Sequence, residues 1–192
     1  DAVAVGASAS AAGIGSTALG SGSVAIGDQS VAVGSGSQAS GLGASAMGSG
    51  AIASGAFASA GGNAAEARAD FFTVFGAGAV AEQAHAVCIG AFSSANATGA
   101  IAFGFGAVAG GTGGIAFGQN SVASANRSIA IGDNAQATAA NTVALGGGST
   151  GDRARQGRVQ AHRLETHSSS LGKGGVAPAG VDGIAADRKD AL

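Results

Sequence analysis

A period of seven residues governs the chain over residues 6–146. Every seventh position in this stretch is Gly in 16 of 21 cases, and the other five are four Ala and Gln83. The position two residues earlier is Ala in 19 of 21 cases, with Val74 and Cys88 as the exceptions. No insertion breaks the frame. A fixed short period indicates a repeat protein, in which each unit contacts only its neighbours.

Heptads usually suggest a coiled coil, but this repeat is not helical. Gly costs about 1 kcal/mol at each helical position, and here it recurs every two turns among β-branched residues. A run such as residues 24–30, VAIGDQS, instead shows alternation over a few residues that ends in Gly. This pattern is typical of a short strand followed by a tight turn, where Gly adopts φ > 0 without steric cost.

Two kinds of strand alternate along the chain. In one set, Val, Ile, Leu, Met or Phe fill 17 of the 22 sites that flank the central residue; in the other they fill six of 20. The true unit is therefore a coil of fourteen residues with two short strands. We predict an all-β solenoid, a parallel β-roll whose coils stack into two parallel sheets.

The side chains of a strand alternate between its two faces, so Ala lines the narrow space between the sheets and its neighbours point outward. One outer face is then polar, and the other is an apolar stripe about 50 Å long, because eleven coils stack about 4.8 Å apart. Soluble monomers rarely expose so large an apolar patch. We therefore predict an obligate parallel homo-oligomer; the period fits a dimer or a trimer and either hand of the coil. The predicted interface residues are Val31, Val33, Val87, Ile89, Ile101, Phe103, Ile115, Phe117, Ile129, Ile131, Val143 and Leu145.

Several units resemble a known repeat. The SVAIG of residues 23–27, the SVAVG of 30–34, the SIAIG of 128–132 and the NTVALG of 141–146 are similar to the YadA-like head repeat of trimeric autotransporter adhesins. In-frame copies cover residues 1–150. The resemblance implies a left-handed parallel β-roll, a homotrimer, and a place in the extracellular passenger of a Gram-negative outer-membrane adhesin. It also implies attachment to host extracellular matrix proteins or cell-surface receptors.

The pattern ends after Gly148, which divides the chain into head repeats over residues 1–150 and an atypical segment over 151–192. Seven of the nine Lys and Arg lie in this last part of the chain. The ending of a typical neck is not recognisable there. The segment is a neck-like or flexible basic connector, or a reading-frame scar, and we predict a short helix over residues 159–166.

Composition excludes several classes of function. The net charge of −2 gives no basis for binding nucleic acid. Gly or Ser interrupts every apolar run before it could span a membrane, so any membrane contact requires an anchor outside this chain. No signal peptide is visible, which favours a cytosolic protein or a piece of a longer exported one. The lone Cys88 replaces a repeat Ala and is expected to be a small buried thiol.

Fragments that imitate catalytic motifs have simpler explanations. The Gly-X-Gly sequences at 76–78 and 104–106 fall at turns, where no helix could follow as a dinucleotide loop requires. His162, Glu165 and His167 miss helical zinc-site spacing by one residue. We therefore expect no catalytic residue, no metal and no cofactor. The charged residues within the repeats gather at Glu66, Arg68, Asp70 and Glu82, as expected of a solvated outer face or, alternatively, of a patch that docks a partner.

The leading functional hypothesis is a non-enzymatic adhesive module, because several copies of one surface add avidity. Phe57 and Phe92 fall in turns, where the rings either contribute to binding or fold over the edge of the coil. One alternative is a structural spacer that projects another adhesive domain. An ice-binding solenoid would need a regular Thr array, which is missing. An enzyme is disfavoured because acidic and His residues do not converge in the repeat frame.

Overall fold

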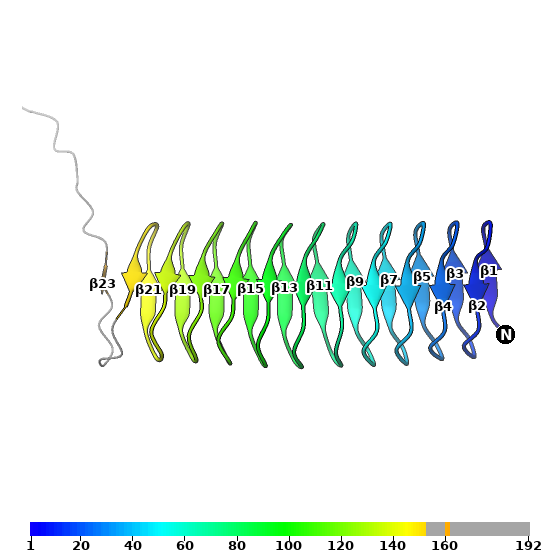
Figure 1. The fold of residues 1–192 in the computed structure, drawn as a ribbon, viewed down its shortest axis with the longest axis horizontal. Coiled ribbons are helices and arrows are strands. Elements are labelled where there is room, and N and C mark those ends of the chain that lie inside the picture. Colours follow the sequence, from blue (N-terminus) through cyan, green and yellow to red (C-terminus); the bar gives the residue numbers. More distant parts are fainter. Residues whose placement is uncertain (153–159, 162–192) are drawn as a thin grey trace, which may run out of the picture. The chain divides into compact units, whose positions relative to one another are not determined.

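The computed structural model describes residues 1–152 and 160–161, which form 23 short strands and no helix (Figure 1). The strands alternate along the chain between two sheets. The 12-stranded odd sheet comprises β1 (Val3–Val5), β3 (Thr17–Leu19), β5 (Val31–Val33), β7 (Ser45–Met47), β9 (Ser59–Gly61), β11 (Thr73–Phe75), β13 (Val87–Ile89), β15 (Ile101–Phe103), β17 (Ile115–Phe117), β19 (Ile129–Ile131), β21 (Val143–Leu145) and β23 (Gln160–Ala161). The 11-stranded even sheet comprises β2 (Ser10–Ala11), β4 (Val24–Ala25), β6 (Gln38–Ala39), β8 (Ile52–Ala53), β10 (Glu66–Ala67), β12 (Val80–Ala81), β14 (Ser94–Ala95), β16 (Val108–Ala109), β18 (Val122–Ala123), β20 (Gln136–Ala137) and β22 (Thr150–Gly151).

Both sheets are parallel, and up to β22 each strand pairs with the strand fourteen residues away, so that equivalent residues lie in register. Ala102 is paired with Ala116, for example, and Phe103 with Phe117. The predicted all-β solenoid of fourteen-residue coils is therefore confirmed. We number the coils from β1, each containing an odd strand, an odd-side turn, an even strand and an even-side turn. Coils 4, 5 and 6 are then residues 45–58, 59–72 and 73–86.

Small side chains fill the space between the sheets. From Ala18 to Ala144, the central residue of each odd strand is fully buried, and most are Ala. The residue just before a strand also faces inward and is usually Ser or Ala. Most buried hydroxyls there have partners within the turn, as Ser23 and Ser121 each donate a hydrogen bond to the carbonyl oxygen three residues earlier, at 2.8 Å. The hydroxyls of Ser16 and Ser30 have no hydrogen-bond partner. The interior is thus thin and closely packed, as the repeat predicts.

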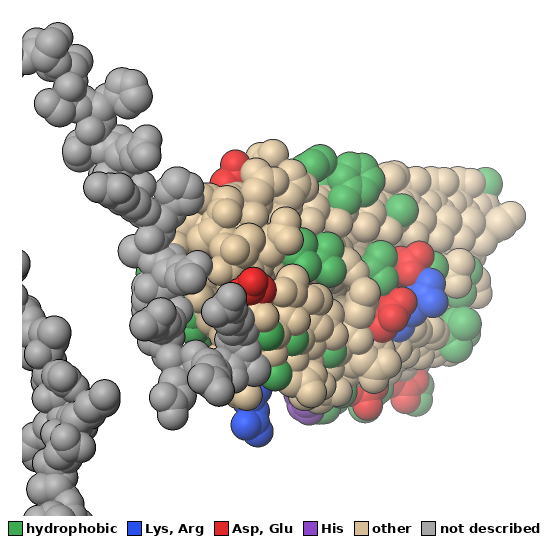
Figure 2. All heavy atoms as spheres, turned by 60° about the vertical axis from the view of Figure 1, so that its left-hand side comes forward, with side chains coloured by type: hydrophobic (Ala, Val, Ile, Leu, Met, Phe, Trp, Pro, Cys, Tyr) green, Lys and Arg blue, Asp and Glu red, His purple; other side chains and the backbone are tan. Residues whose placement is uncertain are grey.

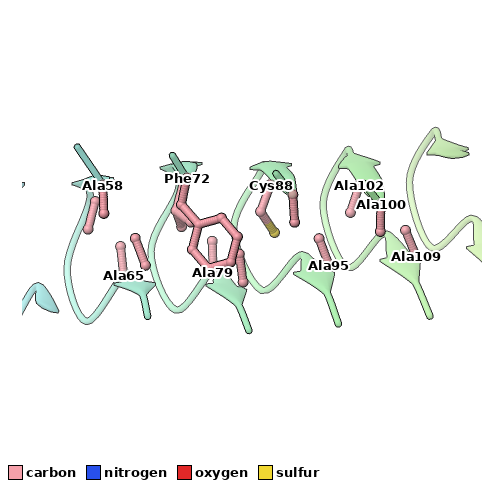
Figure 3. Close-up of a cluster of buried hydrophobic side chains, with 14 of the residues drawn as sticks. Ala58, Ala65, Phe72, Ala79, Cys88, Ala95, Ala100, Ala102 and Ala109 are labelled. Atoms are coloured by element: carbon pink, nitrogen blue, oxygen red, sulfur yellow. The ribbon is translucent and has the colours of Figure 1, made fainter. Parts of the chain in front are cut away.

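One bulky side chain interrupts this thin interior. Phe72 is 1% exposed and occupies a position that is Ser or Ala in most other coils. Its ring projects across the interior among Ala58, Ala65 and Ala79 (Figure 3). Several other coils have Ser at the positions of these three alanines, so the missing hydroxyls leave room for the ring and place no polar group against it.

The two kinds of turn constrain Gly differently. At Gly104, in an odd-side turn, φ is +135° and an added Cβ would lie 2.5 Å from the carbonyl oxygen of Gly118 in the next coil. All eleven equivalent positions, from Gly6 to Gly146, are Gly with φ between +109° and +144°. The matching position in the even-side turns has no positive φ. The five exceptions to the Gly period, Gln83 among them, all lie in these even-side turns.

The sheets continue past Gly148. Thr150 and Gly151 form β22, which pairs with β20, while Gln160 and Ala161 form β23, which pairs with β21. The helix expected over residues 159–166 is therefore wrong at residues 160–161, where the backbone is extended and joins the odd sheet. The rest of that helix, and nearly all of the atypical segment, lie outside the described residues. The boundary at residue 150 stays a prediction.

Replacing Phe72 by Ala tests how tightly the interior is packed. Because the surrounding alanines cannot fill the volume of the ring, we expect Phe72→Ala to lower the free energy of unfolding by about 3–5 kcal/mol. Urea titrations at fixed protein concentration measure this loss. Val122→Ala, at a half-buried outward site of the even sheet, is the control and should cost about 1 kcal/mol. Equal losses for the two variants would contradict the packing argument.

Candidate interaction surfaces

The outward residues of the odd strands, which we call the apolar stripe, follow one face of the solenoid from end to end. Many of these side chains keep more than a third of their surface in solvent: Val3, Val5, Leu19, Met47, Phe75, Ile101, Phe103, Phe117, Ile131 and Leu145. Neighbours in the stripe also touch, since the rings of Phe103 and Phe117 stack with their centroids 4.6 Å apart. All twelve predicted interface residues lie in this stripe and point outward. Their role in an interface stays a prediction.

The stripe is weakest in coils 4, 5 and 6. Four of its five positions without a large apolar side chain lie in these coils, at Ser45, Ser59, Gly61 and Thr73. At Gly61, an added Cβ would lie 2.5 Å from the ring of Phe75, so the glycine provides the space in which that ring lies. The apolar surface of the odd sheet is therefore reduced over these three coils.

The even sheet presents a more polar outer face with one charged cluster, in which acidic and basic side chains lie side by side (Figure 2). Arg68 donates to Glu66 from its Nε, with the nitrogen 2.9 Å from Oε2, and both side chains extend from the same strand region. Such an exposed pair contributes little to stability. Asp70 has a structural role, because its Oδ1 accepts a hydrogen bond from the Ala56 backbone N–H of the preceding coil at 2.8 Å.

A row of aromatic side chains follows the edge formed by the even-side turns. Phe57, Phe71 and His85 lie fourteen residues apart and stack nearly parallel, with centroid separations of 5.6 Å and 5.9 Å. We call these three residues the aromatic ladder. Phe57 and Phe71 keep 51% and 58% of their surface exposed, and His85 is also exposed. The ladder is thus a prominent exposed aromatic surface outside the stripe.

The ladder has a strained backbone. Its three residues have φ of 55°, 61° and 61°, a left-handed conformation that is uncommon for bulky residues and costs on the order of 1–2 kcal/mol each. Most other coils have Gly, Asn or another polar residue at this turn position. Strain of this kind tends to persist at functional sites.

Phe92, in an odd-side turn, has the same conformation, is 64% exposed, and meets Phe105 edge to face at 5.8 Å.

The structure brings together no obvious catalytic constellation in the described residues. Within residues 1–152, no three His, Cys, Asp or Glu side chains are grouped as metal ligands would be. His162, Glu165 and His167 lie outside the described residues. Within the described residues, no helix is long and apolar enough to span a membrane.

Cys88 is buried in the interior, as expected. Its Sγ lies 3.0 Å from the hydroxyl oxygen of Ser93. Burial raises the pKa of the Cys88 thiol, and the contact with Ser93 only partly opposes this effect. A buried thiol with a raised pKa is a poor nucleophile, which argues against a reactive role.

The sequence model of the YadA head domain repeat (2 copies) matches seven overlapping stretches, which together cover residues 1–51 and 81–149. The chain belongs to this family. The YadA head repeat is a fold of adhesins rather than of enzymes, and the coils of the solenoid are its structural units. The segment between the two matched regions, residues 52–80, contains Phe72 and two of the three ladder residues.

Among solved structures, one similar chain aligns with this protein over most of the length of both. The crystal structure of the collagen-binding domain of the Yersinia adhesin YadA is 26% identical, over 90% of this chain and 89% of that chain, with a TM-score of 0.41. No curated protein matches this chain.

The aromatic ladder is the feature that sequence reasoning missed. The turn positions predicted for Phe57 and Phe92 are confirmed, whereas the stacking of Phe57 with Phe71 and His85 was not predicted. The sequence does contain a signal for this stacking, because Phe57, Phe71 and His85 follow one another at intervals of fourteen residues, the length of one coil. The Phe57 ring lies over Gly43 of the preceding coil, where an added Cβ would be 3.0 Å from the ring, and it is half exposed. Its contribution to binding stays a prediction.

The raised pKa of Cys88 predicts a specific dependence of stability on pH. The folded state holds the thiol proton more tightly than the unfolded state, so this contribution is complete below the unfolded pKa and is lost as pH rises through the folded pKa. We expect stability to fall above about pH 8.5, and Cys88→Ala, which restores the repeat residue, to remove that part of the fall. Urea titrations from pH 7 to 10 measure it. An identical alkaline loss in both proteins would show that other groups cause it.

Proposed function

We propose that this chain is the head of a bacterial surface adhesin, which assembles as a parallel homotrimer through the apolar stripe and attaches to host matrix proteins or cells. The observation that carries the proposal is the stripe itself, half exposed along the whole solenoid of a YadA head repeat. In this proposal the chain forms part of the extracellular passenger of an outer-membrane autotransporter. The family supports the trimer and the surface location.

Burial of the stripe supplies the driving force for assembly. Each of its large side chains already has part of its surface covered within the protomer, so covering the remainder contributes on the order of 1 kcal/mol per side chain. The 17 large residues of the stripe together supply enough to offset the entropy lost on association. Because the same pattern recurs in most coils, parallel copies can align coil by coil.

Adhesion is proposed for the surface that the stripe leaves free. The outward residues of the even sheet vary from coil to coil, with Val, Gln, Ile, Glu and Ser at equivalent positions of β4 to β14. Such variation gives different parts of the rod different chemistry, while trimerisation presents three copies of each patch. Weak individual contacts then combine into strong attachment through avidity.

Charge placed in the stripe tests the assembly. We expect Ile115→Asp with Phe117→Asp to dissociate or unfold the oligomer, because uncompensated carboxylates would be buried in it. Light scattering gives the mass, and circular dichroism reports folding. Val122→Asp, on the even sheet of the same coil, is the matched control and should leave the mass unchanged. A wild-type protein that is a folded monomer would refute the proposed assembly.

Binding of the head to immobilised collagen, fibronectin and laminin and to host cells tests adhesion. We expect the wild-type oligomer to bind at least one of these surfaces. A variant dissociated by charge in the stripe, if folded, should bind more weakly by about 100-fold or more, because avidity is lost. If the oligomer binds none of these surfaces, the chain is better described as a spacer that projects another domain.

A further inference from the structure

The aromatic ladder and the gap in the apolar stripe occupy the same three coils. Coils 4, 5 and 6 contain four of the five stripe positions that lack a large apolar side chain. They also contain Phe57, Phe71 and His85, one in each even-side turn. Where the sheet presents less apolar surface, the edge of the solenoid presents more. This coincidence connects the ladder with the surface that buries the stripe.

Symmetry determines which edges would meet in the proposed oligomer. In a closed ring of parallel rods, neighbours are related by rotation about an axis along the rod, without translation. The odd-side turns of one protomer therefore approach the even-side turns of the next, and each coil meets the same coil of its neighbour. The odd strands are only about 10 Å long at three residues each, so the turns lie beside the stripe.

Side-chain sizes at these facing turns are complementary. In coil 4, Phe57 of the even-side turn corresponds to Gly50 of the odd-side turn. Coil 5 pairs Phe71 with Ala64 in the same way. In coil 6, His85 corresponds to Gly78, but the ring of Phe92 of the same chain already lies over this glycine, because an added Cβ would be 3.0 Å from that ring. The small counterpart is therefore uncovered within its own chain in coils 4 and 5.

The arrangement reverses in the next coil without losing this match. In coil 7 the large residue, Phe92, lies in the odd-side turn, and the even-side turn has Gly99. No coil places aromatic residues at these positions in both turns. Aromatic residues at one edge therefore never face aromatic residues at the other.

We propose that the aromatic ladder is a second contact between protomers, in which Phe57 and Phe71 of one chain pack over Gly50 and Ala64 of the next. This contact rests on the proposed homo-oligomer. It specifies the register in which neighbouring chains align, and it provides a second surface that is buried between them. It accounts for the retention of strained aromatic residues at an exposed edge, because burial between chains offsets the backbone cost. It also replaces the apolar contact that the stripe lacks over the same coils.

Exchange of the large and small residues in coil 5 tests the contact. Phe71→Ala removes the ring, and Ala64→Phe places a ring where another already packs, so we expect each single change to speed dissociation of the oligomer by roughly tenfold. The double variant restores one large and one small partner. We therefore expect the double variant to dissociate more slowly, by about fivefold or more, than it would if the two single effects multiplied.

The control combines Ala64→Phe with Phe92→Ala. These residues lie in odd-side turns and cannot face each other in the ring, so their effects should multiply without coupling. Ala64 and Phe71 are both exposed in the protomer. The folding of a single chain therefore does not depend on their contact. Absence of coupling in the coil 5 double variant would overturn the proposal.

Cross-linking gives an independent measure of the register. In a Cys88→Ala background, Ala64→Cys with Phe71→Cys should join neighbouring chains through a short bis-maleimide, whereas Ala64→Cys with Arg127→Cys, four coils apart, should not. An oligomeric mass without cross-linking in coil 5 overturns the ladder contact but leaves the proposed assembly intact. A monomeric mass overturns both. If Phe71→Ala abolishes matrix binding while coupling and cross-linking are absent, the ladder contacts an external ligand instead.

Discussion

The distance between the two sheets is set by alanine methyl groups, and the other surfaces of the solenoid depend on that distance. A thin interior cannot hold the large apolar side chains that a chain of this length would normally bury. They must point outward, where they lie half exposed along the odd sheet. The thin core within each coil therefore stabilises the single rod. The larger hydrophobic free energy, from burial of the stripe, is gained only when a second surface covers the stripe.

Close stacking of the coils imposes the second constraint, and it acts on only one edge. Odd-side turns need Gly because the backbone combines a large positive φ with direct contact on the next coil, as at Gly104. Even-side turns lack the first of these requirements and accept Ala and Gln83 at the matching position. The ladder also lies on the even side, although its turn position has a positive φ on both edges. The more permissive edge is where this chain departs most from its repeat.

Much of the fold could be predicted because a period of fourteen residues determines strand spacing, register and the inward face together. The stripe followed from the same pattern, since residues beside a buried Ala must point outward. Phe72 and the ladder could not be predicted in this way. Phe72 is accommodated by Ala58, Ala65 and Ala79, which are contacts across coils that no local pattern records. The helix expected over residues 159–166 failed at residues 160–161 because pairing with β21 outweighed local preference.

The segment outside the family match is therefore best understood as a set of compensating changes. Within or next to residues 52–80, the stripe loses apolar side chains, the interior gains Phe72 and the even-side edge gains stacked rings. Together these changes move apolar side chains from the outer face of the sheet to the interior and the edge. If the edge is occupied by a neighbouring chain, the Glu66 and Arg68 cluster of the even sheet remains facing solvent in the same coils.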